Sequence, residues 1–184
     1  MMFPVFNTVT IKAEIELPTA EDLTAVCCLS SLNLMYYDEW KFDHWFYYDV
    51  LRMLDNVCST FTRDAPDSLW RAVDFVFAYR SVGVGVLGFH SLLQSKNLSW
   101  ESPMAKGLNL QIFKNIRQKL DWANATLGEQ LGSPKYANGK RFSHVMAIAP
   151  TASTSIILGN ISPSIEPIRA NVYRQDTLSE STSS

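Results

Sequence analysis

The chain has 184 residues, enough for about one domain of ordinary size. Hydrophobic residues make up 47% of it and charged residues 18%, a globular composition that excludes a linker or a disordered tail. Sixteen basic residues against 18 acidic ones give a net charge of -2, which argues against a surface for nucleic acid or an anionic membrane. We therefore expect small molecules or proteins as partners.

Cysteine usage and the N-terminus bear on the compartment. Cys27, Cys28 and Cys58 are too few for a disulfide framework, and nothing near Met1 has the pattern of a secretory signal. We therefore expect a reducing, cytoplasmic setting. No uncharged run approaches the roughly 18 residues of a spanning helix, so the sequence predicts no membrane segment.

Two strands are predicted near the N-terminus. Residues 8–17 alternate between apolar and polar side chains, the pattern of a half-buried strand, and 19–21 resemble a cap and first helical turn. The short apolar run 25–29 predicts a strand buried on both faces. This strand would place Cys27 and Cys28 on opposite faces.

Three helices are predicted farther along. Apolar spacings of three and four predict a helix from about 43 to 59, with Asp55 among the polar residues that face away from the core. A second helix is expected to start near Pro66, because proline is well tolerated in a first turn. The longest pattern begins at the Ser102-Pro103 pair and stops at Gly132, and we expect that helix to serve packing only.

A hydroxyl-rich turn follows the last predicted strand. Residues 144–149 have a strand-like pattern that ends at Pro150, and four hydroxyl side chains lie within 151–155. Such a turn after a strand is where α/β folds commonly hold anionic ligands, and consecutive backbone amides can bind phosphate without Lys or Arg. Hydroxyl-rich loops also occur by chance, so both interpretations stay open.

The segment from Gly83 to Gly88 matches the glycine pattern G-x-G-x-x-G. A dinucleotide site would need a strand before the glycines, a helix after them and an acidic residue about 20 positions on. The preceding residues are predicted to form a helix, and Glu101 lies too close to complete the unit. We therefore expect these glycines to serve close packing.

The histidines and cysteines form no metal-binding pattern. His44, His90 and His144 are isolated, with no further ligand at metal-binding spacing. Adjacent Cys27 and Cys28 could chelate a metal, form a strained vicinal disulfide, or be two small apolar residues of a strand. The residues alone leave these alternatives open, although the last is the commonest.

Five blocks, in order and spacing, carry a family resemblance: Glu14-Ile15-x-Leu17-Pro18-Thr19, Cys27-x-Leu29-Ser30-Ser31-x-Asn33-Leu34, the run from Arg80 to His90, the run from Ala147 to Asn160, and Ser164-Ile165-Glu166-Pro167. Over residues 14–178 they resemble the catalytic large subunit of class I ribonucleotide reductase. Residues 1–13 do not match the family, and 179–184 form a polar tail. The resemblance implies an α/β fold, part of a ten-stranded α/β barrel that is incomplete on its own.

The resemblance also implies a reaction and its residues. Ribonucleoside diphosphates are reduced to 2′-deoxyribonucleotides after a cysteine thiyl takes the 3′-hydrogen. By position, Glu14 accepts the 3′-hydroxyl proton and Cys27 is one member of the reducing cysteine pair, whose partner lies upstream in the family. Cys28 stands where the family usually has another residue, so it is left without a role.

The turn Thr151-Ala152-Ser153-Thr154 matches the loop that holds the substrate diphosphate through amides and hydroxyls. No cofactor or metal is implied in this chain. The radical would be supplied by a metal-containing small subunit, and thioredoxin or glutaredoxin would be the reductant. The implied partners are a ribonucleoside diphosphate, the remaining large-subunit segments and the small subunit, with no direct nucleic acid and no membrane.

The departures from the family concern the radical residue. Thr10 and Lys12 stand where the family has an asparagine and the radical cysteine, and lysine cannot form a thiyl radical. The sequence also lacks the family's allosteric regions, the upstream partner of Cys27, the radical-relaying tyrosines and the C-terminal cysteines that reduce the disulfide. We therefore expect a piece of the large subunit that is inactive alone. A split enzyme, a non-catalytic remnant and a nucleotide-diphosphate-binding module are the alternatives.

Overall fold

The computed structural model describes residues 17–168 and 170. Its strands are β1 (Cys28–Asn33) and β2 (Val82–Leu87). Its α-helices are α1 (Tyr37–Trp40), α2 (His44–Asp64), α3 (Trp70–Tyr79), α4 (Phe89–Ser95), α5 (Pro103–Leu131) and α6 (Ala152–Ile157). Two 3-10 turns, η2 (Leu34–Tyr36) and η3 (Asp67–Leu69), precede α1 and α3. The predicted strand 8–17 and Glu14 lie outside the described residues, apart from Leu17 at the strand's end.

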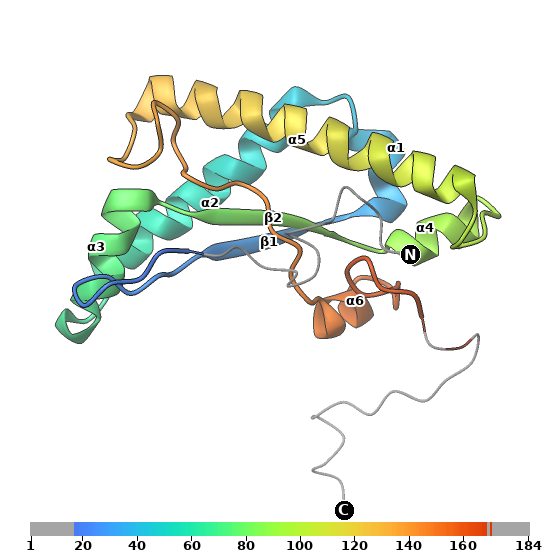
Figure 1. The fold of residues 1–184 in the computed structure, drawn as a ribbon, viewed down its shortest axis with the longest axis horizontal. Coiled ribbons are helices and arrows are strands. Elements are labelled where there is room, and N and C mark those ends of the chain that lie inside the picture. Colours follow the sequence, from blue (N-terminus) through green and yellow to red (C-terminus); the bar gives the residue numbers. More distant parts are fainter. Residues whose placement is uncertain (1–16, 169, 171–184) are drawn as a thin grey trace, which may run out of the picture.

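The two strands form a parallel pair, with Cys28 opposite Val82 and Asn33 opposite Leu87. Helices α2 and α3 make the crossover between them, as a parallel connection requires. Helices α2 and α5 lie along one side of the sheet and α6 lies on the other side (Figure 1). The described residues therefore form a two-stranded parallel sheet with helices on both sides, and no closed barrel forms among them.

Helix α5 follows the sequence pattern closely. The Ser102 side chain accepts a hydrogen bond from the amide of Ala105 at the start, and Gly132 ends the helix with a φ of 83°. The buried stripe that α5 presents to α2 and the sheet includes Ile112, Ile116, Leu120, Ala123 and Leu127. The predicted packing role of this helix is confirmed.

Helix α2 differs from the prediction on one point. It begins after Asp43, whose carboxylate accepts hydrogen bonds from the amides of Trp45 and Phe46, and it continues to Asp64. Asp55 was expected to face away from the core, and this was wrong, because its side chain is buried in the structure. Helical periodicity could not reveal the arginines, distant in sequence, that pair with Asp55.

Three local predictions need correction. Residues 19–21 form no helical turn, because Ala20 pairs with Leu23 in a short bridge. The second strand begins at Cys28 rather than at 25, and Leu29 is 46% exposed. The strand β1 is not buried on both faces, because α2 covers the side on which Cys28 lies and Leu29 points to the other side. Pro66 precedes the η3 turn, so α3 starts only at Trp70.

The glycines of β2 have the packing role that the sequence suggested. A Cβ on Gly83 would lie 2.6 Å from the Cβ of Ala147, and a Cβ on Gly85 would collide with the Ala147 carbonyl. Gly83 and Gly85 therefore let residues 144–149 pass directly against the strand. Both glycines lie inside β2, and only Gly88, with a φ of 82°, stands in the turn between β2 and α4, so the glycine-rich turn of a dinucleotide-binding motif does not form in this segment.

Residues 144–149 were predicted as a strand, and the structure corrects this to a single bridge between Met146 and Val84. The amide of Val82 donates to the carbonyl of His144, and that of Val84 donates to the carbonyl of Val145. An advance of two residues along β2, from Val82 to Val84, is thus paired with an advance of only one residue along 144–149, from His144 to Val145. A regular ladder cannot form at that register, although the segment runs parallel to β2.

The described residues also contain no helix that is both long enough and apolar enough to cross a membrane.

Candidate substrate and redox site

The hydroxyl-rich turn forms the start of α6. Thr151 is the residue before the helix, and Ala152, Ser153 and Thr154 form its first turn. The amides of a first helical turn have no acceptor within the helix, so they are available to an anion. Thr151 is buried, while Ala152, Ser153 and Thr154 are exposed, so the turn presents its amides and two hydroxyl side chains outward.

Hydrogen bonds fix this turn to the rest of the fold. The Oγ1 atom of Thr151 accepts from the amide of Ser164 at 2.7 Å. Ser162 and Ser91 exchange two bonds, each amide donating to the other hydroxyl. The amide of Gly88 donates to the carbonyl of Ser162 at 2.8 Å. The chain after α6 is thereby attached to the start of α4, at the point where β2 ends.

Topology therefore places the turn at the carboxyl edge of the parallel strands. Residues 144–149 run parallel to β2, and the chain after α6 bonds to Gly88, so α6 follows at the same edge where β2 leads into α4 (Figure 1). Ligands of open α/β sheets bind outside the carboxyl ends of their strands. The position of Thr151, Ala152, Ser153 and Thr154 is thus one at which a ligand of this fold class is expected.

Cys27 lies at the other end of the sheet. It immediately precedes β1, its side chain is half-buried, and its Sγ donates a weak hydrogen bond to the carbonyl of Cys28 at 3.7 Å. Cys27 and the 151–154 turn are therefore at opposite ends of the parallel strands. The structure describes these two predicted parts of the site and does not bring them into contact.

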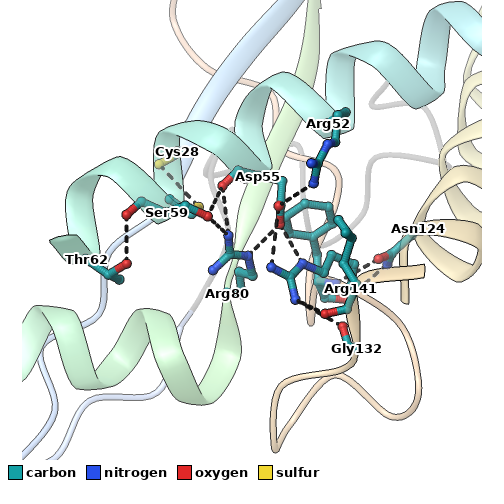
Figure 2. A network of polar contacts seen from close by, with 12 residues as sticks. Cys28, Arg52, Asp55, Ser59, Thr62, Arg80, Asn124, Gly132 and Arg141 are labelled. Atoms are coloured by element: carbon teal, nitrogen blue, oxygen red, sulfur yellow. Dashed lines mark hydrogen bonds and ion pairs between the residues drawn. The ribbon is translucent and has the colours of Figure 1, made fainter. Parts of the chain in front are cut away.

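Cys28 faces α2 rather than Cys27. The Sγ atom of Cys58, in α2, donates to the Sγ atom of Cys28 across 3.8 Å (Figure 2). This hydrogen bond lowers the pKa of Cys28 to about 7, with burial opposing the change and the charge of Arg80 supporting it. The same hydrogen bond and burial raise the pKa of Cys58. Cys28 is thus the member of the pair that ionises more readily, and Cys58 is the member that keeps its proton.

A buried ion-pair network adjoins this thiol pair (Figure 2). The carboxylate of Asp55 accepts from Nε of Arg80 at 2.6 Å and from Nε of Arg141 at 2.6 Å. Arg80 also donates to the hydroxyl of Ser59. Burial acts to raise the pKa of Asp55, but the hydrogen bonds from Arg141 and Arg80 outweigh it, and the pKa lies below its ordinary value.

Asn124 fixes the segment that leads toward the turn. The Nδ2 atom of Asn124 donates to the backbone carbonyl of Phe142, and the Oδ1 atom accepts from the backbone amide of Phe142. The side chain thus bonds to Phe142 as a neighbouring strand would. Arg141 is held as well, because its guanidinium donates to the carbonyls of Leu131 and Gly132. Helix α5 thus sets the path of the chain just before 144–149.

These supporting residues were missed in the sequence. Asp55 is separated from Arg80 by 25 positions and from Arg141 by 86, so no local spacing connects them. Arg80 does stand at the head of the block that contains Gly83 and Gly85, which is the one local signal available. Among residues 17–168 and 170, no cluster of three or more His, Cys, Asp or Glu side chains could hold a metal.

Comparison with known proteins identifies the family. The family model described as "Ribonucleotide reductase, barrel domain" matches residues 13–136 and 121–184. This chain belongs to the ribonucleotide reductase barrel family. The family resemblance and the α/β barrel fold expected from the sequence are confirmed.

Relatives within the ribonucleotide reductase family match most of this chain. The ribonucleoside-diphosphate reductase large subunit of Invertebrate iridescent virus 6 is 57% identical over 171 residues, which are 92% of this chain and 18% of that protein. The protein of the same name from Invertebrate iridescent virus 3 is 52% identical, with 92% of this chain and 27% of that protein covered. The chain therefore spans less than a third of the length of either relative.

A solved structure in the ribonucleotide reductase family supports the fold. The alpha subunit of the Actinobacillus ureae class Id ribonucleotide reductase superimposes with a TM-score of 0.84 at 40% sequence identity. The match covers 92% of this chain and 33% of that subunit. The partial barrel seen here thus corresponds to a part of a larger one.

Proposed function

We propose that this chain is a segment of a ribonucleoside-diphosphate reductase large subunit, which reduces ribonucleoside diphosphates to 2′-deoxyribonucleoside diphosphates for DNA synthesis. The observation that carries the proposal is the 57% identity to a viral protein of that name over 92% of the chain. The segment is inactive alone, because it spans 18% of that relative's length. The remaining large-subunit segments complete the barrel and the active site.

The turn Thr151-Ala152-Ser153-Thr154 holds the diphosphate of the substrate. First-turn amides and the exposed hydroxyls of Ser153 and Thr154 donate hydrogen bonds to the phosphate oxygens, and bonds to a charged acceptor are the stronger kind. The oxygen of Thr151 already accepts from Ser164, which leaves its hydroxyl hydrogen as the donor. Thr151 therefore both anchors the turn and contributes one bond.

Cys27 and Glu14 serve the chemistry at the ribose. Glu14, which lies outside the described residues, accepts the proton of the 3′-hydroxyl. Cys27 and a cysteine from an upstream segment give up two electrons and two hydrogens as they join in a disulfide. The substrate accepts these electrons and hydrogens. Its 2′-hydroxyl leaves as water, and a hydrogen replaces the hydroxyl at the 2′ carbon.

Two partners complete the cycle. The small subunit, which contains the metal, supplies the radical that starts the reaction. Thioredoxin or glutaredoxin returns the Cys27 disulfide to the dithiol by exchange, which takes place in the cytoplasm where thiols are kept reduced. Lys12 occupies the position of the family's radical cysteine, so that cysteine must come from another segment.

Calorimetric titration with a ribonucleoside diphosphate, carried out on the chain co-expressed with the remaining large-subunit segments, tests the substrate site. We expect binding that Ser153→Ala and Thr154→Val weaken severalfold, because each removes one hydroxyl donor to the diphosphate. Thr60→Val, at an exposed position of α2, is the matched control and should bind as the unchanged chain does. Equal affinities for all variants would contradict the assignment of the turn.

Turnover in a reconstituted complex tests the redox assignment. With the remaining large-subunit segments, the small subunit and thioredoxin present, the chain should support deoxyribonucleotide formation. Cys27→Ser should abolish multiple turnover, because the disulfide cannot form. Retained multiple turnover in this variant would refute the role given to Cys27.

A further inference from the structure

Two cysteines that lie far apart in sequence meet where β1 packs on α2. Cys28 is the first residue of β1, and Cys58 stands in the second half of α2, 30 positions later. Their sulfur atoms are 3.8 Å apart, in direct hydrogen-bond contact (Figure 2). Cys58 is 1% exposed and Cys28 is half-buried, so Cys28 is the member that a small oxidant can reach.

We propose that Cys28 and Cys58 form a second redox-active dithiol, separate from the pair assigned to Cys27, which closes to a disulfide when a peroxide is the oxidant. The assignment rests on the contact between the two sulfurs and on the different exposure of the two thiols. The proposal goes beyond the reductase function and does not depend on it.

The surroundings divide the roles between the two sulfurs. The hydrogen bond from Cys58 and the positive charge of Arg80 both lower the pKa of Cys28, which shifts its balance toward the thiolate. A thiolate is the form that attacks peroxides. Cys58 keeps its proton, since burial and the neighbouring Cys28 disfavour a second negative charge. Cys28 is therefore the attacking sulfur and Cys58 the resolving one.

The reaction takes place in two balanced steps. The thiolate of Cys28 attacks one oxygen of hydrogen peroxide and the O–O bond breaks, which gives a sulfenic acid on Cys28 and one hydroxide ion. The sulfur of Cys58 then attacks the sulfur of Cys28, the S–O bond breaks, and the proton of Cys58 leaves with the hydroxyl as water. Two sulfurs have lost two electrons, and the peroxide has gained them.

The geometry allows the bond to form. The sulfurs must approach from 3.8 Å to about 2.05 Å, the length of a disulfide bond. Cys28 is the first residue of its strand, where the chain can adjust without breaking the ladder with β2. Cys27 is not the natural partner of Cys28, because its Sγ contacts the carbonyl of Cys28 and adjacent side chains of an extended chain point apart.

Peptide mapping after controlled oxidation tests this proposal. The reduced full chain is treated with equimolar hydrogen peroxide at pH 7, remaining thiols are blocked with N-ethylmaleimide, and the digest is sequenced by tandem mass spectrometry. We expect one disulfide between Cys28 and Cys58, one blocked thiol on Cys27, and a mass lower by two hydrogens before blocking. A disulfide between Cys27 and Cys28, or oxidation of Cys28 without a link to Cys58, would overturn the proposal.

Matched variants identify the sulfurs. Cys27→Ser should still form the link in the same yield, because Cys27 takes no part in it. Cys28→Ser and Cys58→Ala should each lose it. Cys58 is buried and its replacement can disturb the fold. The peptide map of the oxidised Cys27→Ser variant is therefore sufficient to identify the two linked cysteines. Neither nucleotide nor small subunit is needed, so failure here and failure of the reductase function are distinguishable.

Discussion

Asp55 is the residue on which three arginines converge. Arg80 and Arg141 each lie 2.6 Å from its Oδ1, and Arg52 lies 3.2 Å from its Oδ2. Arg80 adopts a left-handed conformation with a φ of 46°, which a non-glycine residue accepts only at a cost in free energy. Its guanidinium offsets this cost by satisfying the buried carboxylate. The network thereby joins α2, the start of β2 and the segment before 144–149.

Replacing Asp55 should destabilise the fold strongly. We expect Asp55→Ala to lower the free energy of unfolding by roughly 3–5 kcal/mol, because it leaves the buried guanidinium of Arg80 without its carboxylate. Urea denaturation measures the change. Asp64→Ala is the control, since Asp64 pairs with Arg63 on the surface, and it should leave the midpoint unchanged. Equal effects of the two substitutions would refute the role of the network.

Acidification should weaken the same network. The folded pKa of Asp55 lies below its unfolded value, which is about 4, so the stability it contributes is complete above that value and is lost as the pH falls through the folded pKa. Thermal denaturation between pH 7 and pH 2 should therefore show a steeper loss of stability in the unchanged chain than in Asp55→Asn. Parallel curves would contradict this expectation.

The reactivity of Cys28 should depend on pH near neutrality. Its pKa is lowered to about 7 by the hydrogen bond from Cys58, with Arg80 supporting the thiolate and Asp55 standing behind that arginine. In a Cys27→Ser background, the rate of iodoacetamide alkylation of Cys28 should be half-maximal near pH 7. Cys58→Ala should move this midpoint upward, because the donor is gone. An unmoved midpoint would show that Cys58 does not stabilise the thiolate.

Helix α5 contains two glycines in opposite surroundings. A Cβ on Gly107 would have nothing within 4 Å, whereas a Cβ on Gly128 would lie 2.5 Å from the Gly139 carbonyl and 2.8 Å from the backbone of Lys140. Gly128 therefore lets the 139–140 backbone cross the helix closely. The same helix also holds Phe142 through Asn124, so it sets the path of the chain toward the 151–154 turn.

Replacing each of these two glycines by alanine should change the free energy of unfolding in opposite directions. Gly107→Ala should raise the free energy of unfolding by about 0.5–1 kcal/mol, because alanine loses less backbone entropy in a helix. Gly128→Ala should lower it by about 1–3 kcal/mol, because the backbone of 139–140 must move. Chemical denaturation of both variants provides the comparison. A stabilising Gly128→Ala would mean that the crossing is not close in solution.

The molecule as a whole covers its sheet unevenly. Helices α2 and α5 pack on one side, while on the other side Leu29 is 46% exposed and Ile157 in α6 is 81% exposed. The chain spans 18% of the length of a relative that it matches at 57% identity. In a complete barrel, neighbouring segments would cover such surfaces and pair the strand edges.

The isolated chain should therefore associate. We expect light scattering coupled to size-exclusion chromatography to find oligomers or poorly soluble material, because exposed apolar side chains and strand edges favour self-association. Co-expression with the remaining large-subunit segments should yield a soluble complex. A monomer with a sharp thermal transition across a wide concentration range would contradict this prediction.

Local patterns predicted the elements whose signals are local. The capping of α5 by Ser102, its end at Gly132 and the packing role of Gly83 and Gly85 were all predictable, because caps, periodicity and missing side chains act over a few residues. The start of β1 and the irregular course of 144–149 were not. Both depend on the register against β2, which a single segment does not contain.

The sequence by itself determined the family, the long helices α2 and α5 and the polar turn at 151–154, because motif order, periodicity and turn chemistry are all properties of consecutive residues. Only the tertiary structure decided that Asp55 is buried between Arg80 and Arg141, and that Cys28 faces Cys58 rather than Cys27. The reason is physical. These contacts join residues that are 25 to 86 positions apart, and their partners are chosen by the packing of helices on the sheet.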